Sequence, residues 1–276
     1  MKNYLLSKIP HSARPFFRRI YYFPSDLLHR LSAKSRMTPP KSKVFFGNGN
    51  FEEIGQEFKR YLIEFSGLQP HHKILDVGCG IGRMAIPLTD YISDAGSYYG
   101  IDIVKDGIKW CDEEISRRFN NFRFIHTNVF NAHYNSGGDV TASEYKFPFS
   151  DDYFDVVLLT SVFTHMRPAD VENYLSEISR VLVKGGVCLI TFYLINEESS
   201  AAIKNGSSHL DFKHEFDGIL TTDKNMPEAA IAYPQDYVEK IFSANNLDVS
   251  DGIRLGSWCG RQEFLTWQDT IFARKI

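Results

Sequence analysis

One stretch decides the fold of this chain: Ile74-Leu75-Asp76-Val77-Gly78-Cys79-Gly80-Ile81-Gly82-Arg83. Its first four residues have the pattern of a buried strand, and three glycines follow at every second position. Gly78 and Gly80 allow a tight turn in which the backbone can approach a ligand closely. A helix beginning after the turn would direct free N–H groups at a carboxylate or a phosphate. The stretch therefore predicts a nucleotide-binding turn between a strand and a helix.

Short apolar runs alternate with helical stretches after residue 70, which is typical of repeated βαβ units and a mainly parallel sheet. Pro168 opens the helix between the fourth and fifth strands, and Gly185-Gly186 is expected to end it. Capping-box spacing at Asn50 predicts a helix at 51–65, and another is expected at 234–245. We expect seven strands, the last antiparallel, at about 73–78, 97–103, 122–128, 154–160, 186–195, 247–257 and 265–275.

Two segments stand apart from this pattern. Residues 1–43 hold ten Lys or Arg and a single acid, Asp26, so they carry +9 and the rest of the chain −12. Their apolar residues are spaced three and four apart, as in an amphipathic helix that Pro24 should break or kink. We interpret them as an N-terminal helical arm that packs on its own domain or on a second subunit, with an anionic membrane surface as the alternative partner. Residues 44–276 are the main domain, and 196–233, which lack a sustained period, are expected to be a lid insertion.

The composition is that of an ordinary globular protein. Hydrophobic residues make up 43% and charged residues 24% of the 276 residues, which excludes wholesale disorder. The apolar runs are too short to span a bilayer, and Lys8 and Pro10 interrupt any signal peptide. The four cysteines form no C-x-x-C pair, so we expect neither a zinc site nor a disulfide framework. We expect a cytoplasmic protein, peripheral at the inner membrane face if the arm binds lipid.

The second and third strands both end in polar residues. Tyr98-Tyr99-Gly100-Ile101-Asp102 places an acid where the hydroxyls of a ribose would lie; the alternative is an acid that only caps the next helix. The third strand ends at Asn128 and Val129. The amide oxygen of Asn128 can accept a hydrogen bond from an adenine amino group, and the Val129 N–H is a second candidate contact.

As a set, these motifs resemble the class I S-adenosylmethionine-dependent methyltransferases over about residues 70–195. Motif I of that family is a hydrophobic strand, an acid and G-x-G-x-G, as at 74–82 here. Residues 154–166 are similar to its motif IV, and 161–166 resemble a bacterial branch that does not identify an acceptor. The resemblance implies an α/β, Rossmann-like fold with a seven-stranded, mainly parallel sheet and helices on both faces. It also implies S-adenosylmethionine as cofactor and S-adenosylhomocysteine as product, held by Asp76, Gly78, Gly80, Gly82, Arg83, Asp102, Ile103, Asn128, Val129, Thr160 and Ser161. The family commonly has an acid where Asn128 stands.

Other activities fit the sequence less well. A nicotinamide-dependent oxidoreductase is disfavoured, because Arg83 stands where the dinucleotide fingerprint has its third glycine. Methylation of nucleic-acid bases is disfavoured too, since residues 159–162 lack the [DN]-P-P-[YF] motif of enzymes that methylate base amino groups. No acid lies between Thr160 and Pro168 to hold Mg²⁺, so we expect no metal. A cofactor-binding module without catalysis stays open as an alternative.

Methyl transfer needs an aligned acceptor and, for a hydroxyl acceptor, a base that removes its proton. His165, just past the carboxyl end of the fourth strand, is the candidate base; the alternative is a histidine that only hydrogen-bonds a loop. Tyr193, at the end of the fifth strand, and Trp258 and Arg261, in the loop before the last strand, are candidate substrate contacts. We expect methyl transfer to a small molecule or glycan, at oxygen rather than nitrogen, and no nucleic-acid partner.

Overall fold

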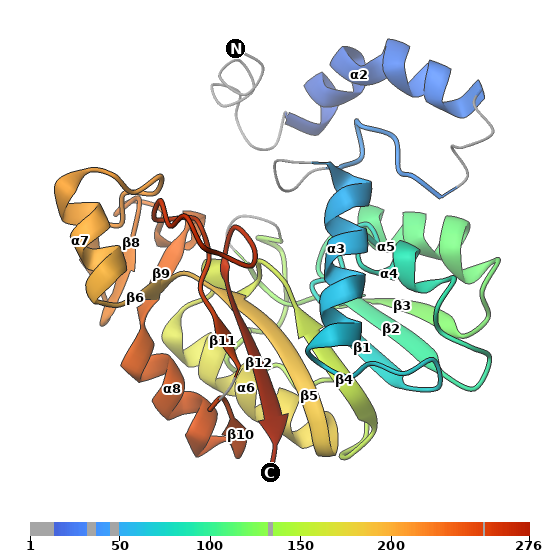
Figure 1. Ribbon diagram of the computed structural model, residues 1–276. Helices are drawn as coiled ribbons and strands as arrows, with labels where there is room; N and C mark the ends of the chain where they lie inside the picture. The colour runs from blue at the N-terminus through green and yellow to red at the C-terminus, as the bar shows by residue number, and fades with distance from the viewer. Residues whose placement is uncertain (1–13, 32–36, 45–49, 132–134, 251) are drawn as a thin grey trace.

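The protein is described here by a computed structural model, which covers residues 14–31, 37–44, 50–131, 135–250 and 252–276. Its centre is a sheet in the order β10-β12-β5-β4-β1-β2-β3, with β11 paired to β12 (Figure 1). The strands β1 to β5 are parallel, and β12 runs antiparallel to β5. This confirms the predicted Rossmann-like α/β fold. The strands of the sheet are β1 (Lys73–Val77), β2 (Ser97–Asp102), β3 (Phe122–His126), β4 (Phe154–Leu159), β5 (Leu182–Phe192), β10 (Leu247–Asp248), β11 (Ile253–Arg254) and β12 (Asp269–Lys275).

The prediction of one continuous sixth strand at 247–257 was wrong. The segment is divided into β10 and β11, which both pair antiparallel with β12. A turn closed by the Gly252 N–H and the Val249 carbonyl, 3.0 Å apart, separates them. The chain passes so close to β12 here that a Cβ on Gly252 would lie 1.7 Å from the Phe272 carbonyl oxygen. Only glycine permits this approach.

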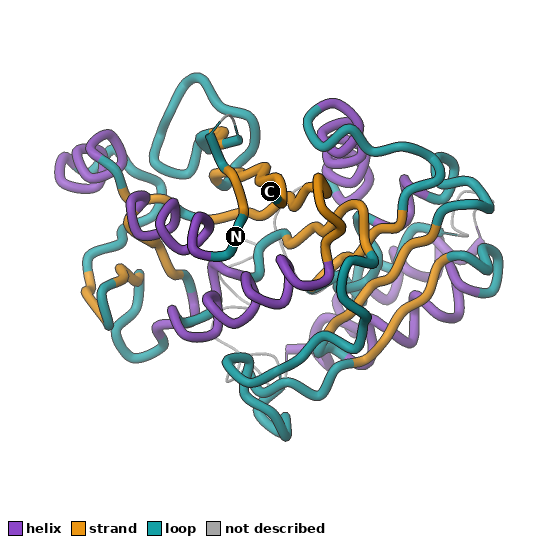
Figure 2. The backbone as a smooth tube through the Cα atoms, turned by 90° about the horizontal axis from the view of Figure 1, so that it is seen from below, coloured by secondary structure: helices purple, strands orange, loops and turns teal. Residues whose placement is uncertain are grey.

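Helices cover both faces of the sheet (Figures 1 and 2). One face carries α3 (Phe51–Glu64), α4 (Ala85–Leu88) and α5 (Lys105–Cys111), which continues as a π-helical turn, η3 (Asp112–Ser116). The other face carries α6 (Pro168–Val181) and α8 (Gln235–Ala244). Each face has its own cluster of buried apolar side chains, so the sheet separates two hydrophobic cores.

Two predicted helix ends were tested by the structure. Asn50 caps α3 as expected, because its side-chain oxygen accepts hydrogen bonds from the N–H groups of Glu52 and Glu53. The end of α6 was predicted wrongly: the helix stops at Val181, and Gly185-Gly186 lie inside β5. Gly186 is needed there for packing, since a Cβ would lie 3.0 Å from the Asp155 carbonyl oxygen of β4.

The segment 196–233 has secondary structure of its own. It contains α7 (Glu197–Asn205), β7 (His214–Phe216), β8 (Ile219–Thr221), η5 (Pro227–Ala229) and the start of β9 (Ile231–Pro234). With β6 (Leu194–Ile195), the continuation of β5, these strands form a second sheet in the order β6-β9-β8-β7. The elements are too short to produce a sustained hydrophobic period, which explains why the sequence pattern did not predict them. A role as a lid stays a prediction.

The arm contains α2 (Arg14–Leu31), which lies apart from the sheet (Figure 1). Pro24 was expected to break or kink this helix, and it does not break it, since α2 continues from Arg14 to Leu31. Pro24 is exposed, so water can bind the Ile20 carbonyl, which loses its helical donor. Ile20 and Phe23 of the arm are 59% and 64% exposed, so these two side chains do not pack on the domain. Packing of the arm on a second subunit and its binding to an anionic membrane stay predictions. Residues 1–13 and 32–36 of the arm lie outside the described residues.

Among the helices of the described residues, none is long and apolar enough to cross a membrane.

A buried ion-pair network holds the carboxyl end of the sheet together. Asp269, the first residue of β12, is fully buried and accepts hydrogen bonds from the N–H groups of Leu194 and Gly256, both at 2.7 Å. Its carboxylate also accepts from Trp258 Nε1 at 2.6 Å and from a terminal nitrogen of Arg261 at 3.1 Å. Arg261 Nε in turn donates to Glu198 of α7 at 2.6 Å. Asp269 therefore connects β12, the loop before it and the insertion.

We expect Asp269→Ala to lower the free energy of unfolding by about 3–5 kcal/mol, because the Arg261 guanidinium and three N–H donors lose their buried acceptor. Urea denaturation of the variant and the unsubstituted protein measures this loss. Glu263→Ala is the matched control, since it removes the same charge from an exposed loop position. A loss below about 1 kcal/mol for Asp269→Ala would show that the network does not hold this end of the sheet.

Candidate functional site

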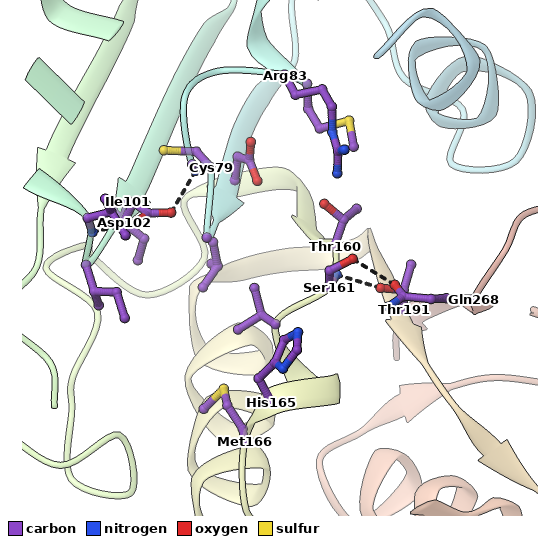
Figure 3. A pocket seen from close by; sticks show the side chains of 18 of the residues that line it. Cys79, Arg83, Ile101, Asp102, Thr160, Ser161, His165, Met166, Thr191 and Gln268 are labelled. Carbon is purple, nitrogen blue, oxygen red and sulfur yellow. Dashed lines mark hydrogen bonds between the residues drawn. The ribbon is translucent and has the colours of Figure 1, made fainter. Parts of the chain in front are cut away.

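A cavity of about 760 Å³ lies at the carboxyl ends of the central strands (Figure 3). Its walls come from the turn after β1, the ends of β2, β4 and β5, one side of α3 and the loop before β12. The strand order reverses here, because β1 is flanked by β2 on one side and by β4 on the other. Crevices at such a switch point are where open α/β sheets bind ligands. A volume of this size is in the range of small-molecule sites.

The glycine-rich turn is fastened to β2 on the side of the cavity. Gly78 and Gly80 have φ of +81° and +59°, a backbone conformation that favours glycine. Asp102 Oδ2 accepts a hydrogen bond from the Gly80 N–H, and its Oδ1 accepts one from the Val104 N–H, both at 2.7 Å. Burial raises the pKa of Asp102, and these backbone donors oppose the rise. The Asp102 carboxylate thus has a structural role, and it also lines the cavity, where each oxygen has further lone-pair capacity.

The turn differs from the sequence expectation in two respects. Gly82 does not line the cavity. A Cβ at this position would lie 2.8 Å from Ile115 Cδ1 and 3.1 Å from Cys111 Sγ, so Gly82 serves the packing of the turn on α5 and η3. The helix after the turn, α4, has only four residues, which is too short to supply the helix dipole that we expected at a ligand.

Asp76 is a buried acid in the wall of the cavity, with 1% of its surface exposed. Its Oδ2 accepts a hydrogen bond from the Tyr98 hydroxyl, and its Oδ1 has no hydrogen-bond partner among the described residues. Burial raises the pKa of Asp76 to about 7, although the Tyr98 hydrogen bond opposes this. A buried oxygen without a donor is costly. An ammonium group of a ligand would fit beside this oxygen and relieve that cost.

Arg83 brings a positive charge to the same part of the cavity. Its side chain extends from the turn toward the end of β4, as Figure 3 shows. Burial lowers the pKa of the guanidinium, and the charge of Asp76 opposes that change. Asp76 and Arg83 together present opposite charges to a ligand that carries both an ammonium and a carboxylate group.

The exit of β4 has a backbone conformation that is uncommon for a side chain. Ser161 has φ of +58°, its N–H donates to Thr191 Oγ1 at 2.8 Å, and its hydroxyl donates to Gln268 Oε1 at 2.9 Å (Figure 3). Conformations of this kind cost energy and cluster at functional sites. These two hydrogen bonds connect the ends of β4 and β5 to the loop before β12.

His165 lies on a 3₁₀ turn, η4 (Phe163–His165), and lines the cavity on the side opposite Arg83 (Figure 3). Its Nδ1 is 2.8 Å from the carbonyl oxygen of Glu228, in the insertion. A carbonyl only accepts, so the hydrogen bond requires the proton on Nδ1; in the neutral ring Nε2 then carries the lone pair. Burial lowers the pKa of His165, while the carbonyls of Glu228 and Ala229 oppose this. His165 thus hydrogen-bonds a loop and also lines the cavity, so both alternatives from the sequence describe part of its position.

Besides Gly82, three residues that the sequence placed at the site do not line the cavity: Asn128, Trp258 and Arg261. Asn128 is exposed; its amide nitrogen donates to Asp139 at 2.7 Å, and its oxygen accepts from Asn135 at 3.1 Å. Trp258 and Arg261 instead donate hydrogen bonds to the carboxylate of Asp269, which is buried and therefore requires donors. Their predicted position in the substrate site was therefore wrong.

The other predicted residues lie on the cavity wall, together with residues that the sequence analysis missed. Ile103, Val129, Thr160, Ser161 and Tyr193 all line it, and their binding roles stay predictions. Among the missed residues are six from α3 and from the loop directly before β12: Ile54, Glu57, Phe58, Thr266, Trp267 and Gln268. The amphipathic pattern of residues 51–65 predicted the helix. It did not indicate that one side of this helix would lie at the carboxyl edge of the sheet.

Comparison with known proteins agrees with this architecture. Residues 75–190 match a family model described as a methyltransferase domain. The tRNA N(3)-cytidine methyltransferase METTL2 of Xenopus tropicalis is 26% identical over 202 residues, which are 71% of this chain and 55% of that protein. The ubiquinone/menaquinone biosynthesis C-methyltransferase UbiE of Vibrio parahaemolyticus is 31% identical over 137 residues, which are 50% of this chain and 47% of that protein. The chain spans about half the length of these curated relatives.

A solved structure of an S-adenosylmethionine-dependent methyltransferase from Methanosarcina mazei has the same fold. It aligns with a TM-score of 0.52 at 21% identity and covers 76% of this chain and 94% of that one. Together with the family match over residues 75–190, this fold is that of a class I methyltransferase domain. Residues 75–190 belong to that family, and the cofactor of the domain is S-adenosylmethionine.

We expect the pH to act on cofactor binding through Asp76. Because its carboxyl has a pKa of about 7, raising the pH from 5.5 to 7.5 ionises it and favours an ammonium beside it. The dissociation constant for S-adenosylmethionine, measured by isothermal titration, should fall roughly 10- to 30-fold over this range. The stability of the cofactor-free protein should change in the opposite direction: above about pH 4 the unfolded carboxyl is ionised while the folded one keeps its proton, so stability is lost as the pH rises through 7.

Asp76→Asn keeps an oxygen for the Tyr98 hydroxyl but cannot ionise. In this variant the pH dependence of the dissociation constant should flatten. An unchanged slope would assign the dependence to another group and remove Asp76 as the partner of the ammonium.

Proposed function

We propose that this chain is an enzyme that transfers the methyl group of S-adenosylmethionine to a hydroxyl oxygen of a small-molecule or glycan acceptor. One observation carries the choice of oxygen: a half-buried histidine with a lowered pKa, His165, lines the cavity just past the end of β4. A hydroxyl acceptor has to lose its proton as the methyl group arrives, and a neutral imidazole can take it. The match of residues 75–190 to a methyltransferase domain argues against the alternative of a nicotinamide-dependent oxidoreductase.

The residues of the cavity fit the cofactor group by group. The Oδ1 of Asp76, which has no hydrogen-bond partner in the part of the chain that is described, suits its ammonium, and the Arg83 guanidinium suits its carboxylate. Asp102 at the end of β2 suits the ribose hydroxyls, for which its oxygens have capacity beyond their backbone donors. The cofactor supplies an electrophilic methyl group on a sulfonium. Gly78 and Gly80 supply the close backbone approach, with Ile103, Val129, Thr160 and Ser161 as further contacts.

The lining of the cavity favours an acceptor with little charge. Apolar and aromatic side chains contribute to its wall, among them Val162, Met166, Tyr193, Leu210 and Trp267. Among the described residues that line the cavity, Arg83 is the only Lys or Arg, and residues 44–276 carry −12. A nucleic-acid backbone would meet repulsion from this body. The names of the relatives include a tRNA cytidine methyltransferase and a quinone C-methyltransferase, so these acceptor classes are the competitors to test.

His165 acts in this proposal as the general base. The Glu228 carbonyl holds the Nδ1 proton and so orients the ring, while Nε2 accepts the acceptor's proton. The same contact ties the insertion 196–233 to the end of β4. We propose that the insertion is a lid that orders around the acceptor and limits the access of water.

The function is tested by supplying methyl-labelled S-adenosylmethionine with three acceptor classes: hydroxylated small molecules and glycans, quinones, and bulk tRNA. We expect S-adenosylhomocysteine to form together with label on oxygen in the first class. Label in tRNA or on quinone carbon alone would overturn the proposed acceptor. Cofactor binding without turnover on all three classes would favour the non-catalytic module.

We expect His165→Asn to lower the rate of transfer to a hydroxyl about 10²- to 10⁴-fold, with the cofactor dissociation constant near that of the unsubstituted protein. The asparagine amide can reach the Glu228 carbonyl as Nδ1 does, so the contact with the insertion is kept while the base is removed. Initial rates across the pH range measure the effect.

His214→Asn makes the same change on β7, outside the cavity wall, and should leave the rate unchanged. If His165→Asn stays within a few-fold and keeps the pH profile, His165 only positions the insertion, and Tyr193 becomes the next candidate base.

A further inference from the structure

The helix α2 presents apolar side chains to solvent. Ile20, Tyr21, Phe23 and Leu27 are between 49% and 64% exposed. They recur at helical spacing along one side of an 18-residue helix, which is the pattern of a face that normally packs on something. Elsewhere in the described chain, the only large apolar side chain exposed on a helix is Ile63 of α3. Apolar surface gathered in this way marks an interaction site.

The polar side of the same helix is turned toward the protein. Asp26 is half-buried, and its Oδ2 accepts a hydrogen bond from the Ser42 N–H at 3.3 Å. Tyr22 and Ser25, on the same side, are also half-buried. The segment that holds Ser42 is connected onward to α3, because Thr38 Oγ1 donates to Glu52 Oε1 at 2.5 Å. The helix is therefore oriented with its polar side inward and its apolar side outward, the reverse of an ordinary surface helix.

We propose that this apolar face of α2 docks in the plane of an anionic lipid bilayer. The charge of the arm selects this partner: residues 1–43 carry +9, and the sequence of α2 holds Arg14, Arg18, Arg19 and Arg30 against a single acid. Aromatic and aliphatic side chains combined with arginines are the composition of helices that lie at a lipid interface. Anionic headgroups attract basic segments over about a Debye length.

A second copy of the chain fits this face less well. Pairing two α2 faces would bring two arms of +9 together, and like charges oppose that association. The remaining exposed large apolar side chains of the described residues belong to loops or chain ends apart from Ile63, so they form no matching helical face: Phe130, Val140, Met226, Phe264, Trp267 and Ile276.

The test is co-sedimentation of the full chain with vesicles of phosphatidylcholine alone or of equal parts phosphatidylcholine and phosphatidylglycerol. We expect binding to the anionic vesicles that weakens as salt is raised from about 0.1 M to about 1 M, which shortens the Debye length from about 10 Å to about 3 Å. The double variant Ile20→Ser, Phe23→Ser should bind at least about tenfold more weakly, since it removes two apolar side chains from the lipid contact.

Ile63→Ser with Phe264→Ser is the matched control, because it makes the same kind of change at exposed positions outside α2 and should bind like the unsubstituted chain. An unchanged cofactor dissociation constant and melting temperature show that the α2 variant is folded. Equal binding to both vesicle types, or full binding by the α2 variant, would overturn the proposal. Loss of a dimer in that variant, with no vesicle binding by the unsubstituted chain, would assign the face to a second copy instead. Membrane binding and methyl transfer are measured separately, so either proposal can fail without the other.

Discussion

The pair of hydrogen bonds that Asp102 accepts from the backbone is the constraint on which the site depends. A carboxylate at the end of β2 holds the Gly80 N–H and the Val104 N–H, and so fastens the glycine-rich turn to the neighbouring strand. These hydrogen bonds help to hold the turn in a conformation in which Gly78 and Gly80 have positive φ. Asp76 and Arg83 reach the cavity from either end of this turn. The same acid thus shapes the site and is available to a ligand in it.

Buried charge is used in two different ways in this protein. Asp269 is surrounded by donors, including the Arg261 guanidinium, and its network fixes the loop before β12. Asp76, at the wall of the cavity, has one hydrogen-bond donor, and its other oxygen has no partner among the described residues. A satisfied buried carboxylate contributes to a rigid fold, whereas a half-satisfied one is costly until a ligand completes it. Both carboxylates lie at the carboxyl edge of the sheet, where Asp269 holds the chain together and Asp76 lines the cavity.

The insertion contributes to the site through its backbone as well as its side chains. The carbonyl of Glu228 orients His165, and α7 reaches the Asp269 network through Glu198. The insertion is therefore connected both to the exit of β4 and to the loop before β12. A change in its position would change the orientation of the His165 imidazole.

Local patterns in the sequence were enough to predict the parallel sheet, the glycine turn, the N-cap of α3 at Asn50 and the acids near the ends of β1 and β2. These features follow from short-range physics: apolar periodicity, glycine φ values and the direction of parallel strands, which brings their carboxyl ends together. The tertiary structure alone decided that Trp258, Arg261 and Asn128 face other partners, that Gln268 and α3 line the cavity, and that α2 turns its apolar side outward. Those outcomes depend on which distant group satisfies a buried donor or acceptor. Trp258 and Arg261, for example, donate hydrogen bonds to the buried Asp269, and the spacing of these residues in the sequence does not predict those contacts.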